Sequence, residues 1–230
     1  MRLAISADSS WNRWHPTYDD LGQRCQRLGI DAVELVYYPE NEGFDRAPET
    51  LKKYGVDVVC VNATAKKRIN VLEDPKPAQD NINACIDLAA DLGAEFVVIY
   101  AGHNKRWNFK ERVELFRRRM EPCLQKATDR DVTLLIENHF DLRGEDPDYT
   151  DVVRRPDLTA VFLDALDCPQ IRVNFDPGNL YAARIEPWPY AYRILKDYIA
   201  YAHFKDMAYF SELLYGPLHE NETLTDTLGG

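Results

Sequence analysis

The sequence has no long hydrophobic run. Nowhere do about 18 apolar residues follow one another, the length that a membrane-spanning helix needs. The first ten residues, MRLAISADSS, also lack the apolar core of a secretory signal peptide. We therefore expect neither a membrane contact nor secretion, and the expected location is the cytoplasm.

Cysteine is scarce, and its positions form no recognisable pair. The number of cysteines is odd, and no Cys-X-X-Cys spacing occurs among them. Such a pattern is typical of reduced thiols in a cytosolic protein and argues against a disulfide framework or a zinc finger. The five are Cys25, Cys60, Cys85, Cys123 and Cys168.

Positive charge is also in short supply. The 230 residues include 28 Lys and Arg against 38 Asp and Glu, which gives a net charge of −10. Proteins that bind the phosphate backbone of nucleic acid present a basic face, so we expect no nucleic-acid partner. Low-complexity tracts, internal repeats and linkers are absent as well. Because 45% of the residues are hydrophobic, the chain can bury a core, and we expect one domain over residues 1–230.

What the sequence does contain is an alternation of short apolar runs with longer amphipathic segments. Apolar residues recur every three or four positions in 18–28, 82–92 and 109–124, which is the spacing of one helix face. Gly29, Gly55 and Gly93 stand where such a helix ends, a position that favours glycine. The runs that predict strands are 3–7, 32–37, 56–62, 95–101, 132–138, 171–176 and 199–205.

Strands that alternate strictly with helices predict a parallel sheet. The runs VVCVNA, FVVIYAG and TLLIEN are apolar throughout, as strands covered on both faces should be. A barrel and an open doubly wound sheet both satisfy this pattern. The open sheet usually carries a Gly-X-Gly-X-X-Gly motif after an early strand, and none is present. We therefore predict an α/β fold of the (β/α)-barrel type.

Polar residues stand where these apolar strands end. In a barrel all the strand ends meet at the C-terminal mouth, where barrel enzymes keep their active sites. Each residue also has an ordinary explanation: Glu34 could form a structural ion pair, Asp176 could begin a turn, and His203 could be a hydrogen-bonded core residue. The residues at the strand ends are Glu34, Asn62, Glu137, His139, Asp176, His203 and Asp206.

Three of these residues indicate a metal site. Glu137, Asp176 and His203 end three successive strands, and neighbouring strands lie about 4.8 Å apart, so their side chains can reach one point. Two carboxylates at one point repel each other unless a cation lies between them. A carboxylate-rich set with one imidazole suits Mn²⁺, Mg²⁺ or Co²⁺ better than a thiolate-type zinc centre.

In the order and spacing of its motifs the chain resembles the xylose-isomerase-like barrel superfamily of sugar isomerases, epimerases and inosose dehydratases. The resemblance runs from MRLAISADSS through IDAVELV, DLGAEFVVIYAG, TLLIENH and VNFDPGNL to AHFKD, and so covers nearly the whole chain. It implies a (β/α)8 TIM-type barrel whose metal is held by Glu, Asp, His and Glu at strands five to eight. The first three ligands match Glu137, Asp176 and His203, and the fourth has no counterpart.

After AHFKD the sequence predicts neither an eighth strand nor a final helix. The late glutamates Glu220 and Glu222 lie in a polar segment. We therefore expect strand eight and the last helix of the barrel to be missing, and the domain 1–230 to be incomplete at its C-terminus. Either the sequence ends before these elements, or the barrel is open or is closed by a partner, and a homo-oligomer is compatible with this expectation.

The resemblance implies a divalent-metal-dependent isomerase or epimerase of a sugar or sugar derivative, which transfers a proton through a metal-stabilised enediolate. Glu137 would be both ligand and base, with Mn²⁺, Mg²⁺, Co²⁺ or Zn²⁺ as the metal. Asn138, His139, Asn179 and Lys205 would bind substrate hydroxyls or hold the ligands, unless Lys205 pairs with Asp206. The remaining expected substrate contacts are Glu34, Asn62, His103, Asp206 and the loop residues Trp11, Trp14 and His15.

Three other functions remain open at this point. A keto-polyol dehydratase of the inosose type uses the same proton removal beside a carbonyl. A non-catalytic barrel subunit would have lost its fourth ligand and would bind no metal. An apurinic endonuclease of the type-IV kind holds three zinc ions with more histidines than the five present here. Measuring metal content would distinguish the non-catalytic subunit from the enzymes, and measuring DNA binding would distinguish the endonuclease from the other functions.

Overall fold

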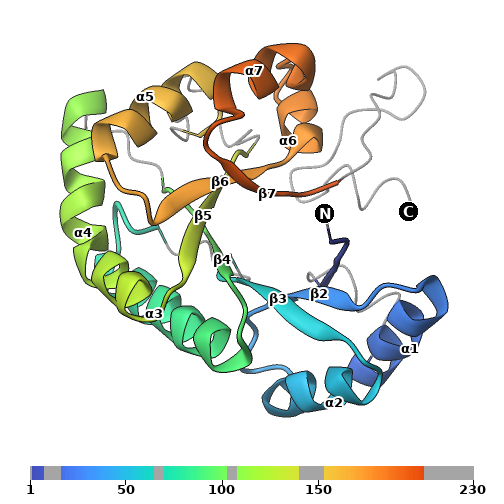
Figure 1. Ribbon diagram of the computed structural model, residues 1–230. Coiled ribbons are helices and arrows are strands. Elements are labelled where there is room, and N and C mark those ends of the chain that lie inside the picture. The colour runs from blue at the N-terminus through green and yellow to red at the C-terminus, as the bar shows by residue number, and fades with distance from the viewer. Residues whose placement is uncertain (1, 8–16, 65–69, 103–107, 140–152, 205–230) are drawn as a thin grey trace, which may run out of the picture.

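A computed structural model describes residues 2–7, 17–64, 70–102, 108–139 and 153–204 of the chain (Figure 1). Within these residues seven parallel strands pair in sequence order, β1-β2-β3-β4-β5-β6-β7. This arrangement agrees with the predicted alternation of strands and helices. The strands are β1 (Ile5–Ala7), β2 (Ala32–Val36), β3 (Asp57–Asn62), β4 (Phe96–Ile99), β5 (Thr133–Glu137), β6 (Ile171–Phe175) and β7 (Ile199–Ala202).

The sheet is curled, so that β1 and β7 lie on the same side of the molecule (Figure 1). One contact shows how strong the curvature is. In a flat sheet β2 and β7 would be five strand spacings apart, or roughly 24 Å. Instead, Nε2 of His203, directly after β7, lies 2.8 Å from Oε2 of Glu34 in β2. The barrel prediction is confirmed, and the open doubly wound sheet is excluded.

Helices surround the outside of the curled sheet (Figure 1). Their ends follow local sequence signals. In α4, Asn108 and Glu111 form a reciprocal capping box, and Thr17 caps the start of α1 through Asp20 N–H. The helical elements are α1 (Tyr18–Leu28), η2 (Phe44–Arg46), α2 (Ala47–Lys53), α3 (Pro75–Leu92), α4 (Phe109–Asp129), α5 (Pro156–Leu166), α6 (Pro177–Ala182), η3 (Pro187–Ala191) and α7 (Tyr192–Leu195).

Glycines end two of the long helices in the left-handed region, as the sequence predicted. Gly29 follows α1 with φ 66°, and Gly93 follows α3 with φ 70°. An L side chain is strained at these angles, which is why glycine suits the position. In the described ranges, no helix is long and apolar enough to cross a membrane.

Two layers of apolar side chains fill the molecule. The larger lies between sheet and helices and includes the fully buried Leu21, Ile86, Phe116 and Phe162. The smaller lies inside the barrel, where the inward residues of three neighbouring strands meet: Cys60, Val98 and Leu135, with Phe96 and Tyr201 packed against them.

The inner layer explains where the polar strand ends lie. Side chains two residues apart on a strand point to the same face. Two residues beyond Cys60, Leu135 and Tyr201 in the chain stand Asn62, Glu137 and His203. These polar side chains therefore cap the apolar inner layer at the C-terminal mouth of the barrel. The expected absence of an eighth strand concerns residues 205–230, which lie outside the described residues.

Candidate metal centre

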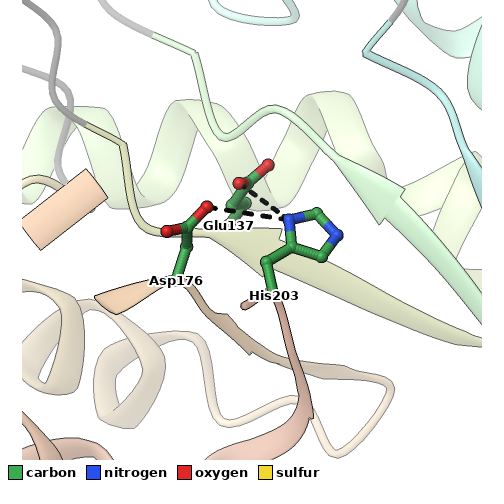
Figure 2. Close-up of side chains that lie close together, drawn as sticks. All are labelled: Glu137, Asp176 and His203. Carbon is green, nitrogen blue, oxygen red and sulfur yellow. Dashed lines mark hydrogen bonds and ion pairs between the residues drawn. The ribbon is translucent and has the colours of Figure 1, made fainter. Parts of the chain in front are cut away.

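Glu137, Asp176 and His203 come together at the mouth of the barrel. Glu137 is the last residue of β5, Asp176 follows β6, and His203 follows β7. One ligand atom of each lies within 4.8 Å of the others, and Figure 2 shows the two carboxyl groups facing one edge of the imidazole. Nδ1 of His203 is 3.1 Å from Oε1 of Glu137 and 3.8 Å from Oδ2 of Asp176.

Asp176 is held rigidly because it also begins α6. Its Oδ1 accepts the N–H of Asn179 at 2.8 Å as the N-cap of that helix, and Pro177 stands at the first helical position. The turn-initiating role considered for Asp176 is thus real, and it leaves Oδ2 facing His203. The Asn179 side chain donates to Oε1 of Glu137 and to the backbone oxygen of Asn138, both at 3.0 Å. Asn179 therefore connects the two carboxylates.

Asn138 connects the ends of β5 and β6. Its Nδ2 donates to the backbone oxygen of Asp176 at 2.7 Å, and its Oδ1 accepts the backbone N–H of Asp176 at 2.9 Å. Asn138 is 1% exposed. This pair of bonds fixes the backbone from which Asp176 projects.

Replacing Asn138 with Ala should therefore destabilise the protein by about 1–3 kcal/mol, because two buried backbone groups of Asp176 lose a partner. Chemical denaturation measures the change. The control is Asn81→Ala, which removes one part-buried bond to the oxygen of Ala63 and should cost less. Equal losses in the two variants would contradict the role given to Asn138.

A third carboxylate, Glu34, lies on the other side of the His203 ring. Glu34 is 1% exposed, and its Oε2 is 2.8 Å from Nε2 of His203. Its Oε1 accepts from Ser6 Oγ and from Asn62 Nδ2, both at 2.9 Å. The Asn174 side-chain nitrogen lies 3.1 and 3.2 Å from the two ring nitrogens of His203. The imidazole thus contacts groups from β2, β5 and β6, and groups from β1 and β3 hold Glu34 beside it.

The electrostatics of this cluster favour a cation at its centre. Burial lowers the pKa of His203, but hydrogen bonds to Asp176, Glu137 and Glu34 and the charge of Glu34 outweigh burial and raise it to about 12. Burial raises the pKa of Glu34, but the charge and hydrogen bond of His203, together with bonds from Asn62 and Ser6, hold it below its usual value. Three carboxylates around one imidazole leave an excess of negative charge that a divalent ion would offset.

The donor set fits a divalent metal ion. Two ligands on one ion with bonds of about 2.2 Å lie at most about 4.4 Å apart. Separations within 4.8 Å meet this limit after side-chain movements of a few tenths of an ångström. The side chains of Glu137 and His203 are 13% and 16% exposed, while that of Asp176 is fully buried. An ion held here would therefore face the solvent on the side of Glu137 and His203.

Of the residues selected from the sequence, Glu34, Asn62, Asn138 and Asn179 lie around the three proposed ligands. His139 is half-buried beyond β5. Ser6 and Asn174 were not selected: Ser6 is an exposed residue of β1, whereas Asn174 is buried in β6 and stands two residues before Asp176 on the same face of its strand. The predictions for Trp11, Trp14, His15, His103, Lys205 and Asp206 lie outside the described residues.

Comparisons with known proteins agree with this fold. The protein resembles a probable 3-DHS dehydratase of petrobactin synthesis from Bacillus anthracis, with TM-score 0.70 and 17% identity over 91% of this chain and 74% of that one. It resembles a 3-keto-D-glucoside 4-epimerase from E. coli, with TM-score 0.69 and 12% identity over 90% of this chain and 79% of that one. A xylose isomerase-like TIM barrel protein from Mycobacterium smegmatis, in complex with magnesium, gives TM-score 0.60 and 17% identity over 82% and 67%.

These likenesses are in structure, and they establish the fold. A search of curated proteins finds no match. The model of the xylose isomerase-like TIM barrel family matches residues 23–220, which is most of the chain. The chain therefore belongs to the xylose isomerase-like TIM barrel family.

Proposed function

We propose that the protein is a divalent-metal-dependent isomerase or epimerase of a sugar or sugar derivative. One observation carries the proposal: ligand atoms of Glu137, Asp176 and His203 lie within 4.8 Å of one another at the mouth of a family barrel. Sugar epimerases among proteins of similar structure support the same class. Mn²⁺, Mg²⁺ or Co²⁺ suits the two carboxylates and one imidazole, and Zn²⁺ is the further candidate.

The two carboxylates differ in ways that assign their roles. Asp176 is fully buried, and one of its oxygens accepts the N-cap hydrogen bond of α6, so we assign it only the role of metal ligand. Glu137 is the more exposed carboxylate and can approach a substrate from the mouth. We therefore assign to Glu137 the removal of a carbon-bound proton beside a carbonyl. Asn179 keeps this carboxylate in place through its 3.0 Å bond to Oε1.

A bound divalent cation would polarise the carbonyl and stabilise the enediolate left by proton removal. The chain's residues supply the rest of the chemistry at the mouth. Glu137 accepts the proton, while Asn138 and Asn179 maintain the spacing of the two carboxylates. The apolar inner layer of Cys60, Val98 and Leu135 closes the barrel below and keeps water from that side.

A dehydratase acting on a keto-polyol is the second candidate, because it begins with the same proton removal. A probable dehydratase is among the proteins of similar structure and supports this second candidate. The two reactions differ in their second step. An epimerase or isomerase returns the proton to carbon, whereas a dehydratase expels a neighbouring hydroxyl.

We expect the protein, loaded with Mn²⁺, to exchange the hydrogen beside the carbonyl of at least one ketose, aldose or keto-polyol for deuterium. Incubating a substrate panel in D₂O and following it by NMR and mass spectrometry measures this exchange. An isomerised or epimerised product supports the first function, and loss of water supports the second. A protein that binds the metal but exchanges no substrate hydrogen across the panel would contradict both enzyme functions.

A further inference from the structure

We infer that Glu34 is a positioning residue, which turns the metal-binding nitrogen of His203 toward Glu137 and Asp176 by fixing the hydrogen on the opposite ring nitrogen. The inference rests on the proposed metal site. It gives Glu34 a role other than the substrate contact expected from the sequence. A chain of hydrogen bonds leads from a backbone N–H through Asn62 to Glu34 and His203, and each bond in it has a defined donor: the N–H orients the Asn62 amide, and the Glu34 carboxylate accepts from both sides.

Thr64 fixes the orientation of the Asn62 side-chain amide. Its backbone N–H donates to Oδ1 of Asn62 at 2.9 Å, and its hydroxyl lies 2.6 Å from the same oxygen. A backbone N–H can only donate, so the atom of Asn62 that faces it must be the oxygen. The amide nitrogen of Asn62 then points the other way, and it donates to Oε1 of Glu34 at 2.9 Å.

The carboxylate of Glu34 accepts hydrogen bonds on both sides. Its Oε1 already accepts from Asn62 and from Ser6, and its Oε2 lies 2.8 Å from Nε2 of His203. A carboxylate only accepts, so the hydrogen in this contact belongs to Nε2. In the metal-free protein Nδ1 also faces a carboxylate, so the ring carries a hydrogen there as well; a metal bound at Nδ1 would replace that hydrogen, whereas the hydrogen on Nε2 stays with Glu34. Nδ1 is the nitrogen that faces Glu137 at 3.1 Å and Asp176 at 3.8 Å.

The position of Glu34 argues against its being a ligand or a substrate contact. It contacts the ring nitrogen opposite the one that faces Glu137 and Asp176. It is 1% exposed, whereas Glu137 and His203 reach the solvent. A histidine that binds a metal commonly donates its second N–H to a carboxylate, which fixes the ring and makes the bound nitrogen more basic.

Glu34→Gln tests this role with little change in shape. The Gln side chain has one oxygen and one NH₂ group, and the Asn62 NH₂ group, which can only donate, requires the oxygen at the Oε1 position. The NH₂ group therefore faces Nε2 of His203, which must become an acceptor. The one remaining ring hydrogen is then held on Nδ1, where a metal would bind. We expect the affinity of the full-length protein for Mn²⁺ to fall about 10–100-fold, measured by calorimetry.

Glu114→Gln is the matched control. It makes the same chemical change on the exposed surface of α4, so Mn²⁺ affinity should stay close to that of the wild type. If Glu114→Gln weakens binding as much as Glu34→Gln does, the effect comes from the loss of a negative charge anywhere on the protein. The positioning role would then be wrong.

A second measurement separates the tautomer from the loss of a nearby negative charge. Histidine labelled with ¹⁵N reports by NMR which ring nitrogen carries hydrogen, and Zn²⁺ serves as a diamagnetic probe. In the wild type we expect hydrogen on Nε2 and the metal on Nδ1 of His203. In Glu34→Gln the hydrogen should appear on Nδ1. If the variant does not fold, the wild-type spectrum alone decides, because a metal on Nε2 would overturn the inference.

The outcomes distinguish this inference from the proposed function. Wild-type protein that binds neither Mn²⁺ nor Zn²⁺ would refute the metal site and with it the role of Glu34. Wild-type protein that binds metal, together with a Glu34→Gln variant that binds it equally well, would refute the role of Glu34 alone.

Discussion

Glu137→Gln is expected to abolish stabilisation by metal and to lower activity by at least two orders of magnitude. The substitution keeps the shape of the side chain but removes one proposed ligand charge and the proposed base. A positioned general base contributes about 10²–10⁴-fold to a rate. A ligand that binds only the native state adds about 2.7 kcal/mol at a hundredfold excess over its Kd, and the variant should lose this gain. Thermal melts with excess Mn²⁺ and with chelator measure the stability change.

In chelator the same variant should be as stable as the wild type or more stable. Removing one of several crowded carboxylates relieves repulsion, and His203 keeps its contacts with Glu34 and Asp176. Glu114→Gln, on the exposed surface of α4, serves as the matched control and should leave the response to Mn²⁺ unchanged. A Glu137→Gln protein that melts well below the wild type in chelator, with a wild type indifferent to Mn²⁺, would mean that Glu137 is a structural ion-pair partner.

The barrel could be predicted from sequence because the strands β2 to β6 are largely buried on both faces. All five residues of β2 are buried, for example, and all but Glu34 are apolar. Strand ends were less well predicted: β7 (Ile199–Ala202) ends at Ala202, whereas the predicted run continued through residues 203 and 204. The helical elements α6, η3 and α7 lie in a stretch with Pro177, Pro187 and Pro189 and have no long apolar period to reveal them.

The grouping of Glu137, Asp176 and His203 could be predicted because these residues end consecutive strands of a parallel sheet. The contact between Glu34 and His203 could not, because it joins β2 to the residue after β7, and only the curvature of the sheet brings them together. The sequence shows a buried glutamate but not its partner. For the same reason, the contacts of Ser6 and Asn174 depend on packing across the barrel.

His203→Ala is expected to destabilise the metal-free protein by about 3–5 kcal/mol, because it leaves buried carboxylates without their cation. Glu34 and Asp176 are essentially inaccessible to water and lose the imidazole that faces them. Chemical denaturation in chelator measures the loss. The Glu34→Gln/His203→Ala double variant is the informative comparison, because removing one stranded charge should restore part of the stability. A single variant within about 1 kcal/mol of the wild type would contradict the electrostatic account, since such a loss is typical of an ordinary substitution.

The pH dependence of the stability lost in His203→Ala tests the electrostatic explanation more directly. The pKa of His203 is raised to about 12 in the folded protein, whereas an unfolded histidine titrates near 6.5. The folded state therefore holds one more proton between these values. The stabilising contribution of His203 is complete below about pH 6.5 and is lost as the pH rises toward 12. The gap in stability between wild type and His203→Ala, measured in chelator, should narrow as the pH is raised over this range. A gap that stays constant would show that the loss reflects packing of the imidazole ring and not its charge.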